Sequence, residues 1–120
     1  MFKMVHHCYN VLNLERSMEF YAKALGFSEK RRMDTPKFTL VFLGDGEGEF
    51  ELELTYLKDR TEPYDLGEGE MHLAVRTGDM EKAHKLHEDM GVICFENKEL
   101  GVYFIEDPDG YWIEVVPSRK

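Results

Sequence analysis

Four side chains that can bind a metal ion stand at matching places in two similar halves of the chain. The first half has His6 directly after MFKMV and Glu53 within FELELTY. The second half has His72 within MHLAV and Glu114 within YWIEVV. A duplicated fold can bring two such pairs around one point. Two imidazole nitrogens and two carboxylate oxygens suit a first-row divalent ion that keeps two positions for water or substrate.

Strand alternation decides which of two adjacent histidines, His6 or His7, corresponds to His72. Successive strand residues point to opposite faces of a sheet. The face that includes His7 is bulkier and more apolar, as expected of a face that packs against helices. His6 is therefore the expected ligand and His7 a packed residue. The same alternation places Glu53 and Glu114 opposite their apolar strand neighbours.

Each of these residues taken singly has an ordinary explanation. A lone histidine on a strand is usually structural or exposed, and a glutamate that alternates with apolar residues usually faces solvent. The repetition of the pair in both halves is what favours a metal site. Two further histidines, His84 and His87, share a predicted helix at i and i+3, where packing or exposure is the expected role. Glu51 is expected to face solvent or to support a ligand.

The elements that position these side chains follow from the hydrophobic pattern. Strands are expected over 4–11, 27–34, 37–43 and 50–57 in the first half, and over 70–76, 92–96, 101–106 and 111–116 in the second. One helix in each half is expected to begin after Asn13 or Asp79 and to end at Gly26 or Gly91. Each half thus predicts βαβββ and an α+β fold. The polar segment 58–69 predicts a linker, so one domain contains two repeats, about 1–60 and 68–120.

Composition excludes several classes of partner. The formal net charge of −9 argues against binding to nucleic acid. No run approaches the roughly 18 apolar residues of a membrane span, and the amino terminus does not resemble a signal peptide. The two isolated cysteines, Cys8 and Cys94, are expected to be free thiols, although a disulfide between them stays open. A cytoplasmic protein is therefore expected.

Several motifs resemble glyoxalase I of the vicinal-oxygen-chelate superfamily. They are HHCYNVLNLERSMEFYAKALGF, FELELTY, MHLAV and FIEDPDGYWIEVV, and the similarity covers about 4–116. The resemblance implies two βαβββ modules, a homodimer, and one divalent metal per site held by His6, Glu53, His72 and Glu114. Because the chain is short, it is similar to the form that prefers Ni²⁺ or Co²⁺ over Zn²⁺. Whether the site forms within one chain or across the dimer stays open.

The resemblance also implies a reaction. Glyoxalase I, also called lactoylglutathione lyase, detoxifies methylglyoxal. It converts the hemithioacetal of methylglyoxal and a thiol to an S-lactoyl thioester, by proton transfer through an enediolate. Glu114 is then the expected general base, with Glu53 as the partner carboxylate. Trp112 and Phe104 are candidates for excluding water from the site, with core packing the expected role of Phe104.

Two departures from the family pattern concern the thiol that would serve as co-substrate. Asn10 stands where members that use glutathione carry an arginine, and the loop at 97–102, within the segment ENKELGV (96–102), is shortened. Glutathione is therefore in question as co-substrate, and Arg76 and Lys98 are candidates for the missing cation.

Other functions in the superfamily remain alternatives. The similar epimerases carry glutamine where this chain has Glu53, which favours glyoxalase I over them. Extradiol dioxygenases and thiol transferases of the superfamily use two histidines and one glutamate. A non-catalytic module that binds a small molecule or drug is the alternative that needs no metal.

Overall fold

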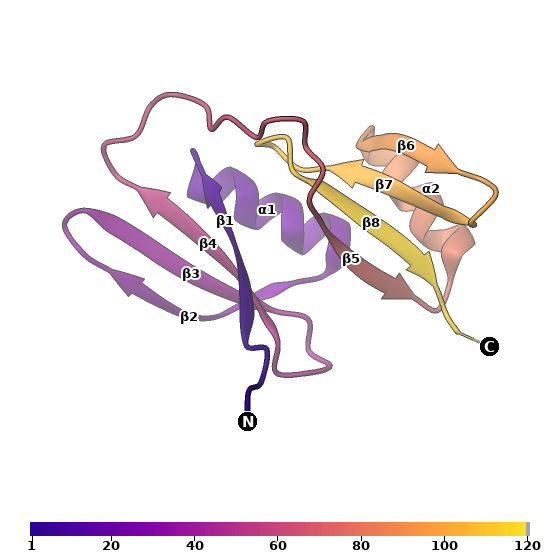
Figure 1. The fold of residues 1–120 in the computed structure, drawn as a ribbon, viewed down its shortest axis with the longest axis horizontal. Coiled ribbons are helices and arrows are strands. Elements are labelled where there is room, and N and C mark those ends of the chain that lie inside the picture. Colours follow the sequence, from indigo (N-terminus) through magenta and orange to yellow (C-terminus); the bar gives the residue numbers. More distant parts are fainter. Residues whose placement is uncertain (120) are drawn as a thin grey trace. The chain divides into compact units, whose positions relative to one another are not determined.

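The computed structural model describes residues 1–119 and contains two compact units, which meet in sequence between Tyr64 and Asp65. The first unit contains β1 (His6–Val11), α1 (Leu14–Leu25), β2 (Ser28–Asp34), β3 (Phe38–Gly44) and β4 (Glu51–Leu57). The second unit contains β5 (His72–Thr77), α2 (Met80–Met90), β6 (Ile93–Asn97), β7 (Val102–Glu106) and β8 (Trp112–Pro117). Both units therefore have the predicted βαβββ order (Figure 1).

The two sheets have the same topology. Strand order is β1-β4-β3-β2 in the first unit and β5-β8-β7-β6 in the second. In each sheet the first strand pairs in parallel with the last, and the remaining pairs are antiparallel. The first strand is thus hydrogen-bonded to the strand most distant from it in the sequence of its unit. This pairing brings each histidine strand beside its glutamate strand.

Both helices begin and end where the sequence predicts. The Asn13 side chain accepts a hydrogen bond from the Arg16 amide at 3.0 Å, and Asp79 accepts one from the Lys82 amide at 3.0 Å. These bonds satisfy amides that have no partner inside the first helical turn. At the other ends Gly26 and Gly91 adopt positive φ angles of 72° and 71°, a conformation that glycine reaches without steric cost.

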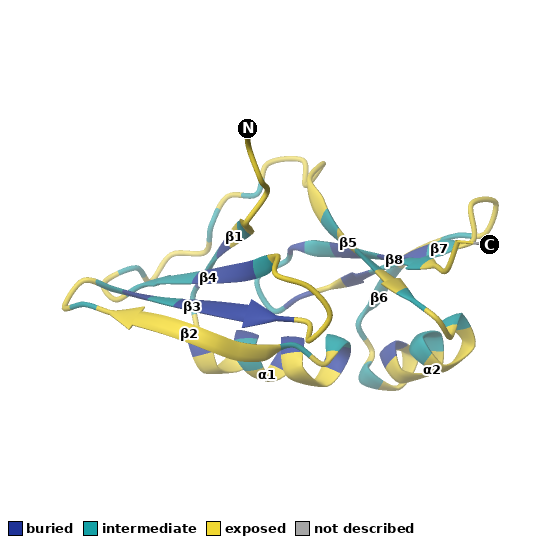
Figure 2. Ribbon diagram, turned by 90° about the horizontal axis from the view of Figure 1, so that it is seen from below, coloured by how far each residue is buried: buried dark blue, intermediate teal, exposed yellow. Residues whose placement is uncertain are grey.

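Each helix covers one face of the sheet in its own unit, and the core lies between them (Figure 2). We call this face the helix face. Its buried side chains in the first unit include Tyr9, Val41 and Leu54 from the strands and Tyr21 from α1. We call the opposite face the ligand face; it carries His6, Cys8, Glu53 and Thr55 in the first unit and His72, Ala74, Glu114 and Val116 in the second.

Strand limits differ from the sequence prediction by one or two residues at most ends. β1, for example, begins at His6 rather than at Met4, because its register with β4 begins at the pair His6 and Glu51. Cys8 and Cys94 are both free, as expected. Among residues 1–119, neither helix is long and apolar enough to span a membrane.

Candidate functional site

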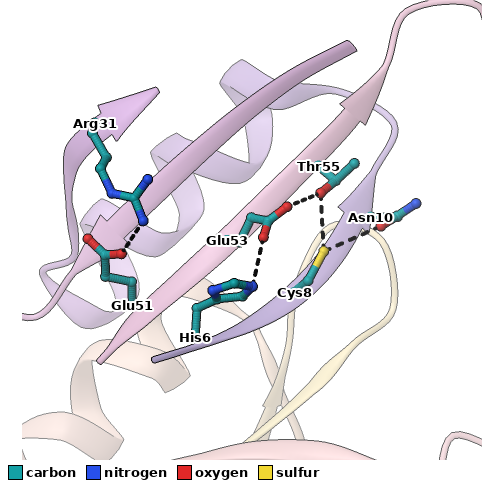
Figure 3. Close-up of polar contacts among 7 residues, drawn as sticks. All are labelled: His6, Cys8, Asn10, Arg31, Glu51, Glu53 and Thr55. Carbon is teal, nitrogen blue, oxygen red and sulfur yellow. Dashed lines mark hydrogen bonds and ion pairs between the residues drawn. The ribbon is translucent and has the colours of Figure 1, made fainter. Parts of the chain in front are cut away.

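The first unit brings His6 and Glu53 together on its ligand face (Figure 3). His6 Nε2 lies 3.1 Å from Glu53 Oε1, across the parallel pairing of β1 and β4. The imidazole is 39% exposed, whereas the carboxylate is only 12% exposed. The histidine can thus reach a ligand in solvent while the glutamate stays largely covered by its neighbours.

A chain of hydrogen bonds continues from the other oxygen of Glu53. The Thr55 hydroxyl donates to Glu53 Oε2 at 2.7 Å, and Cys8 Sγ lies 3.1 Å from the same hydroxyl oxygen (Figure 3). Cys8 Sγ also lies 3.6 Å from Asn10 Oδ1. Burial raises the pKa of the Cys8 thiol, and the nearby Glu53 carboxylate raises it further. The thiol therefore keeps its proton at neutral pH and can donate it to a hydrogen bond.

A cation that the sequence analysis missed lies on the same face. The Arg31 guanidinium lies 3.7 Å from the centroid of the Phe42 ring and donates to Glu51 Oε1 at 2.9 Å. The Phe42 ring in turn meets His6 edge to face, with centroids 5.7 Å apart. Glu51 is therefore held by an ion pair instead of facing solvent alone. Arg31 and Glu51 are distant in sequence, so this contact could not be predicted from the sequence. It depends on the antiparallel pairing of β2 with β3, which places Arg31 beside Phe42.

The second unit repeats the His/Glu pair. His72 Nε2 lies 3.2 Å from Glu114 Oε1, and the two side chains are 37% and 21% exposed. The pair again joins the first and last strands of the unit, here β5 and β8. Strand alternation therefore identified His6 instead of His7 as the equivalent of His72.

Aromatic side chains surround this second pair. Phe104 meets the His72 ring edge to face at 5.1 Å between centroids and lies 5.4 Å from Trp112. Phe95 stacks on Trp112 at 6.2 Å. The prediction of core packing for Phe104 is wrong, because Phe104 pairs with Glu114 in the ladder and so lies on the ligand face. The sequence analysis did not name Phe95. Only the folded structure identifies it, as an exposed aromatic side chain on the short strand β6.

The geometry of each pair fits two neighbouring ligands of one metal ion. Ligands at right angles, each about 2.1 Å from a first-row ion, lie about 3.0 Å apart. The two observed N···O distances, 3.1 Å and 3.2 Å, are close to that separation. Within residues 1–119 no group of three or more histidine, cysteine or acidic side chains is gathered closely enough to hold a metal. Each unit therefore brings one histidine and one glutamate together, and the four-ligand set predicted from the sequence stays a prediction.

The remaining histidines have structural partners or packed positions. His87 is 2% exposed, and its Nδ1 lies 2.8 Å from the Tyr103 hydroxyl. Burial and, to a smaller extent, the nearby Glu96 carboxylate together raise the pKa of Tyr103 to about 12. His84 pairs with Glu96 at 2.8 Å. His7 lies on the helix face against Tyr9, as predicted.

The two predicted replacement cations lie in different surroundings. Arg76 Nε donates to the backbone carbonyl of Pro117 at 3.2 Å. Lys98 lines an open groove of about 540 Å³ beside α2, together with His84 and Glu96. Within residues 1–119, neither is paired with a carboxylate as Arg31 is.

Comparison with known proteins identifies the family. Residues 3–115 match the model of the Glyoxalase/Bleomycin resistance protein/Dioxygenase superfamily. The chain belongs to this superfamily. The match spans both units, so the βαβββ repeat observed in the structure is the repeat of the family.

Curated relatives narrow the class. The lactoylglutathione lyase of Neisseria meningitidis serogroup A is 37% identical over 128 residues, covering 98% of this chain and 92% of that protein. The lactoylglutathione lyase of Escherichia coli O157:H7 is 32% identical and covers 98% and 93%. The prediction of a glyoxalase I-like enzyme is confirmed at this level.

Solved structures agree. Glyoxalase I of Leishmania major, described as trypanothione-dependent, superposes with a TM-score of 0.86 at 35% identity, covering 98% of this chain and 87% of that one. Glyoxalase I of Zea mays has a TM-score of 0.84 at 32% identity, covering 98% and 45%. An antibiotic-binding protein from Streptomyces, TnmS3, is 18% identical with a TM-score of 0.76, which shows a shared fold alone.

Proposed function

We propose that the chain is a metal-dependent isomerase that converts a methylglyoxal–thiol hemithioacetal to an S-lactoyl thioester. The observation that carries the proposal is the pair of matched His–Glu contacts, at 3.1 Å and 3.2 Å, on the ligand faces of the two units. The similarity to lactoylglutathione lyases supports the same reaction.

His6, Glu53, His72 and Glu114 would hold the metal, with Ni²⁺ as the proposed ion and Co²⁺ or Zn²⁺ as alternatives. The donor set supports this choice, because nitrogen and carboxylate ligands suit such ions and no thiolate set is present among residues 1–119. When bound, the ion would act as a Lewis acid that stabilises negative charge on substrate oxygens.

Glu114 is the proposed general base. Its carboxylate would take the proton from the carbon that bears sulfur and return a proton to the adjacent carbon. One C–H bond breaks and one forms through an enediolate, and the hydroxyl proton passes from the oxygen of the first carbon to the oxygen of the second, so no external oxidant is needed. Glu114 is suited to this role because its contact with His72 engages only one of its oxygens. A positioned base contributes about 10²–10⁴ in rate.

The aromatic group beside His72 has a supporting role. Phe95, Phe104 and Trp112 form an apolar surface next to the second pair. Such a surface would exclude water near the reacting carbons and so protect the enediolate from side reactions. It would also contact the apolar part of the substrate.

The four ligands would come together either within one chain or between two chains. We propose a homodimer, because oligomers commonly form with two-fold symmetry and each unit supplies only two ligands. A cytoplasmic setting is proposed as well, since the free thiols of Cys8 and Cys94 persist in a reducing compartment.

The thiol co-substrate is best resolved by experiment. Purified protein, stripped with chelator and reloaded with Ni²⁺, would be assayed for thioester formation from methylglyoxal with glutathione and, separately, with trypanothione. Activity restored by Ni²⁺ with either thiol supports the proposal. Absence of thioester with both thiols, in protein shown to contain one metal per site, would overturn it.

A further inference from the structure

Glu53 and Glu114 occupy matching positions, yet their second oxygens have different surroundings. A carboxylate only accepts hydrogen bonds, so the single hydroxyl proton of Thr55 must point to Glu53 Oε2, 2.7 Å away. The Thr55 oxygen is then free to accept, and Cys8 Sγ lies 3.1 Å from it. Where Cys8 and Thr55 share a hydrogen bond the thiol is therefore the donor, and the same thiol also lies 3.6 Å from a second acceptor, Asn10 Oδ1.

Among residues 65–119, the second unit has no counterpart of this series of hydrogen bonds. The residues matching Thr55 and Cys8 are Val116 and Ala74, neither of which has a side-chain donor. Among residues 65–119, only the His72 ring is in hydrogen-bonding contact with the Glu114 carboxylate. One carboxylate is thus held at both oxygens and the other at one.

We propose that Thr55, supported by Cys8, is a positioning residue that fixes Glu53 as a stationary metal ligand and leaves Glu114 as the carboxylate able to move. The proposal rests on the proposed function. Its physical basis is that a hydrogen-bonded outer partner orients a ligand before the ion arrives. A charge-assisted bond to one oxygen restricts rotation of the carboxylate and directs Oε1 toward His6.

The burial of the two carboxylates agrees with this difference. Glu53 is 12% exposed and Glu114 is 21% exposed, so the pinned side chain is also the better covered one. A base that must leave its resting contact and approach carbon needs freedom of rotation. Val116 leaves Glu114 that freedom, whereas a hydroxyl at the same place would restrict it.

The first experiment measures binding of Ni²⁺ to metal-free protein by titration calorimetry, which needs no turnover. Thr55→Val removes the donor at nearly constant volume and is expected to weaken Ni²⁺ binding 10- to 100-fold. Thr55→Ser keeps the hydroxyl and should bind as the parent does. Thr39→Val is the matched control, because Thr39 donates to the Asp34 carboxylate at 2.8 Å in the same sheet, away from Glu53.

The second experiment makes the reciprocal change. Val116→Thr places a hydroxyl two residues beyond Glu114, as Thr55 lies two residues beyond Glu53. We expect kcat to fall about tenfold, within the range seen for outer-partner changes, while Ni²⁺ affinity is kept or increased. Unchanged kcat in an active Val116→Thr protein would show that mobility of Glu114 does not matter.

The outcomes separate this proposal from the proposed function. Weaker Ni²⁺ binding by Thr55→Val, with Thr55→Ser and Thr39→Val at parental affinity, supports the positioning role even if no thioester forms with any thiol. Equal binding by Thr55→Val and the parent overturns the role even if the parent is fully active. A parent that binds no Ni²⁺ overturns it together with the metal centre.

Discussion

The ligand faces of the two units share a His/Glu pair and a phenylalanine, Phe42 or Phe104, that meets the imidazole edge to face, and they differ in the other neighbours of the pair. In the first unit the pair is flanked by hydrogen-bonding groups, namely the Thr55–Cys8 chain and the Arg31–Glu51 ion pair. In the second unit the flanking positions carry Ala74, Val116 and Trp112, with Phe95 and Phe104 stacked nearby. The two units thus have nearly the same distance between imidazole and carboxylate, 3.1 Å and 3.2 Å, and different surroundings.

The difference teaches that two chemically identical pairs need not have identical roles. A polar neighbourhood holds its carboxylate through charge-assisted hydrogen bonds and favours a fixed ligand. An apolar neighbourhood leaves its carboxylate fewer restraints and excludes water, which suits a group that transfers a proton. In the proposed reaction the first unit would chiefly bind the ion and the second would chiefly perform chemistry.

The helix faces of the two units also differ, at one buried position. In the second unit the core contains a polar pair, His87 and Tyr103, with 2.8 Å between Nδ1 and the hydroxyl. Counted from the N-caps, the position of His87 corresponds to Tyr21 in the first unit, which is fully buried. The second unit thus has a buried contact between His87 and Tyr103 at a place where the first unit has the phenol side chain of Tyr21.

The prediction with the largest expected effect concerns the different roles proposed for Glu114 and Glu53. Glu114→Gln should lower kcat by about 10²–10⁴ while the fold is retained, because the amide cannot accept the substrate proton. Glu53→Gln should instead act mainly on Ni²⁺ affinity. Steady-state kinetics and calorimetry on both variants, with the exposed Glu88→Gln as control, measure the contrast. Near-normal turnover in Glu114→Gln would remove Glu114 from the mechanism.

Loss of an imidazole tests whether both units contribute to the same metal centre. His6→Ala and His72→Ala should each reduce Ni²⁺ affinity more than about 100-fold, since removal of a ligand exceeds the effect of losing its outer partner. Metal content after dialysis measures this loss, with His84→Ala, a histidine on α2 that pairs with Glu96, as control. Full metal retention in either ligand variant would contradict the assignment for that unit.

The buried pair of the second unit gives a stability prediction. Tyr103→Phe leaves His87 Nδ1 without its partner and should reduce the free energy of unfolding by about 1–3 kcal/mol. Urea denaturation followed by circular dichroism measures the change. An unchanged free energy of unfolding in Tyr103→Phe would show that this contact does not stabilise the fold.

The same tyrosine gives a pH prediction. Burial raises the pKa of folded Tyr103 to about 12 from an ordinary value of 10.0. Since the folded state holds this proton more tightly, its stabilising contribution is complete below pH 10 and is lost as pH rises toward 12. Urea midpoints at several pH values should therefore fall more steeply in the parent than in Tyr103→Phe. If the urea midpoints of the two proteins fell equally with pH, the raised pKa would not belong to Tyr103.

The smallest effect concerns the aromatic surface. Trp112→Ala removes the rings' contact with Phe95 and Phe104 and should raise KM about fivefold, equivalent to about 1 kcal/mol of binding. Ni²⁺ affinity should stay unchanged, because no metal-binding group is lost. Kinetics and calorimetry on one preparation separate the two quantities, and a loss of metal with constant KM would assign Trp112 to support of the ligands.

Local patterns in the chain were enough to predict the order of elements, both helix caps, and the choice of His6 over His7. Each depends on residues close in sequence: alternation along a strand follows from backbone geometry, and a cap is a bond to an amide two or three residues away. The neighbours of Phe104 and Arg31 could not be predicted in this way. They depend on which strands pair and in what register.

The contacts that give this protein its candidate chemistry are of that second kind. Four donors were recognisable from residue type and spacing, but the 3.1 Å approach of His6 to Glu53 exists only because β1 pairs in parallel with β4. Likewise, the unequal treatment of Glu53 and Glu114 arises from side chains on neighbouring strands. Hydrogen bonds between strands that are far apart in the sequence depend on how the whole sheet pairs. They therefore cannot be predicted from residues close together in the sequence.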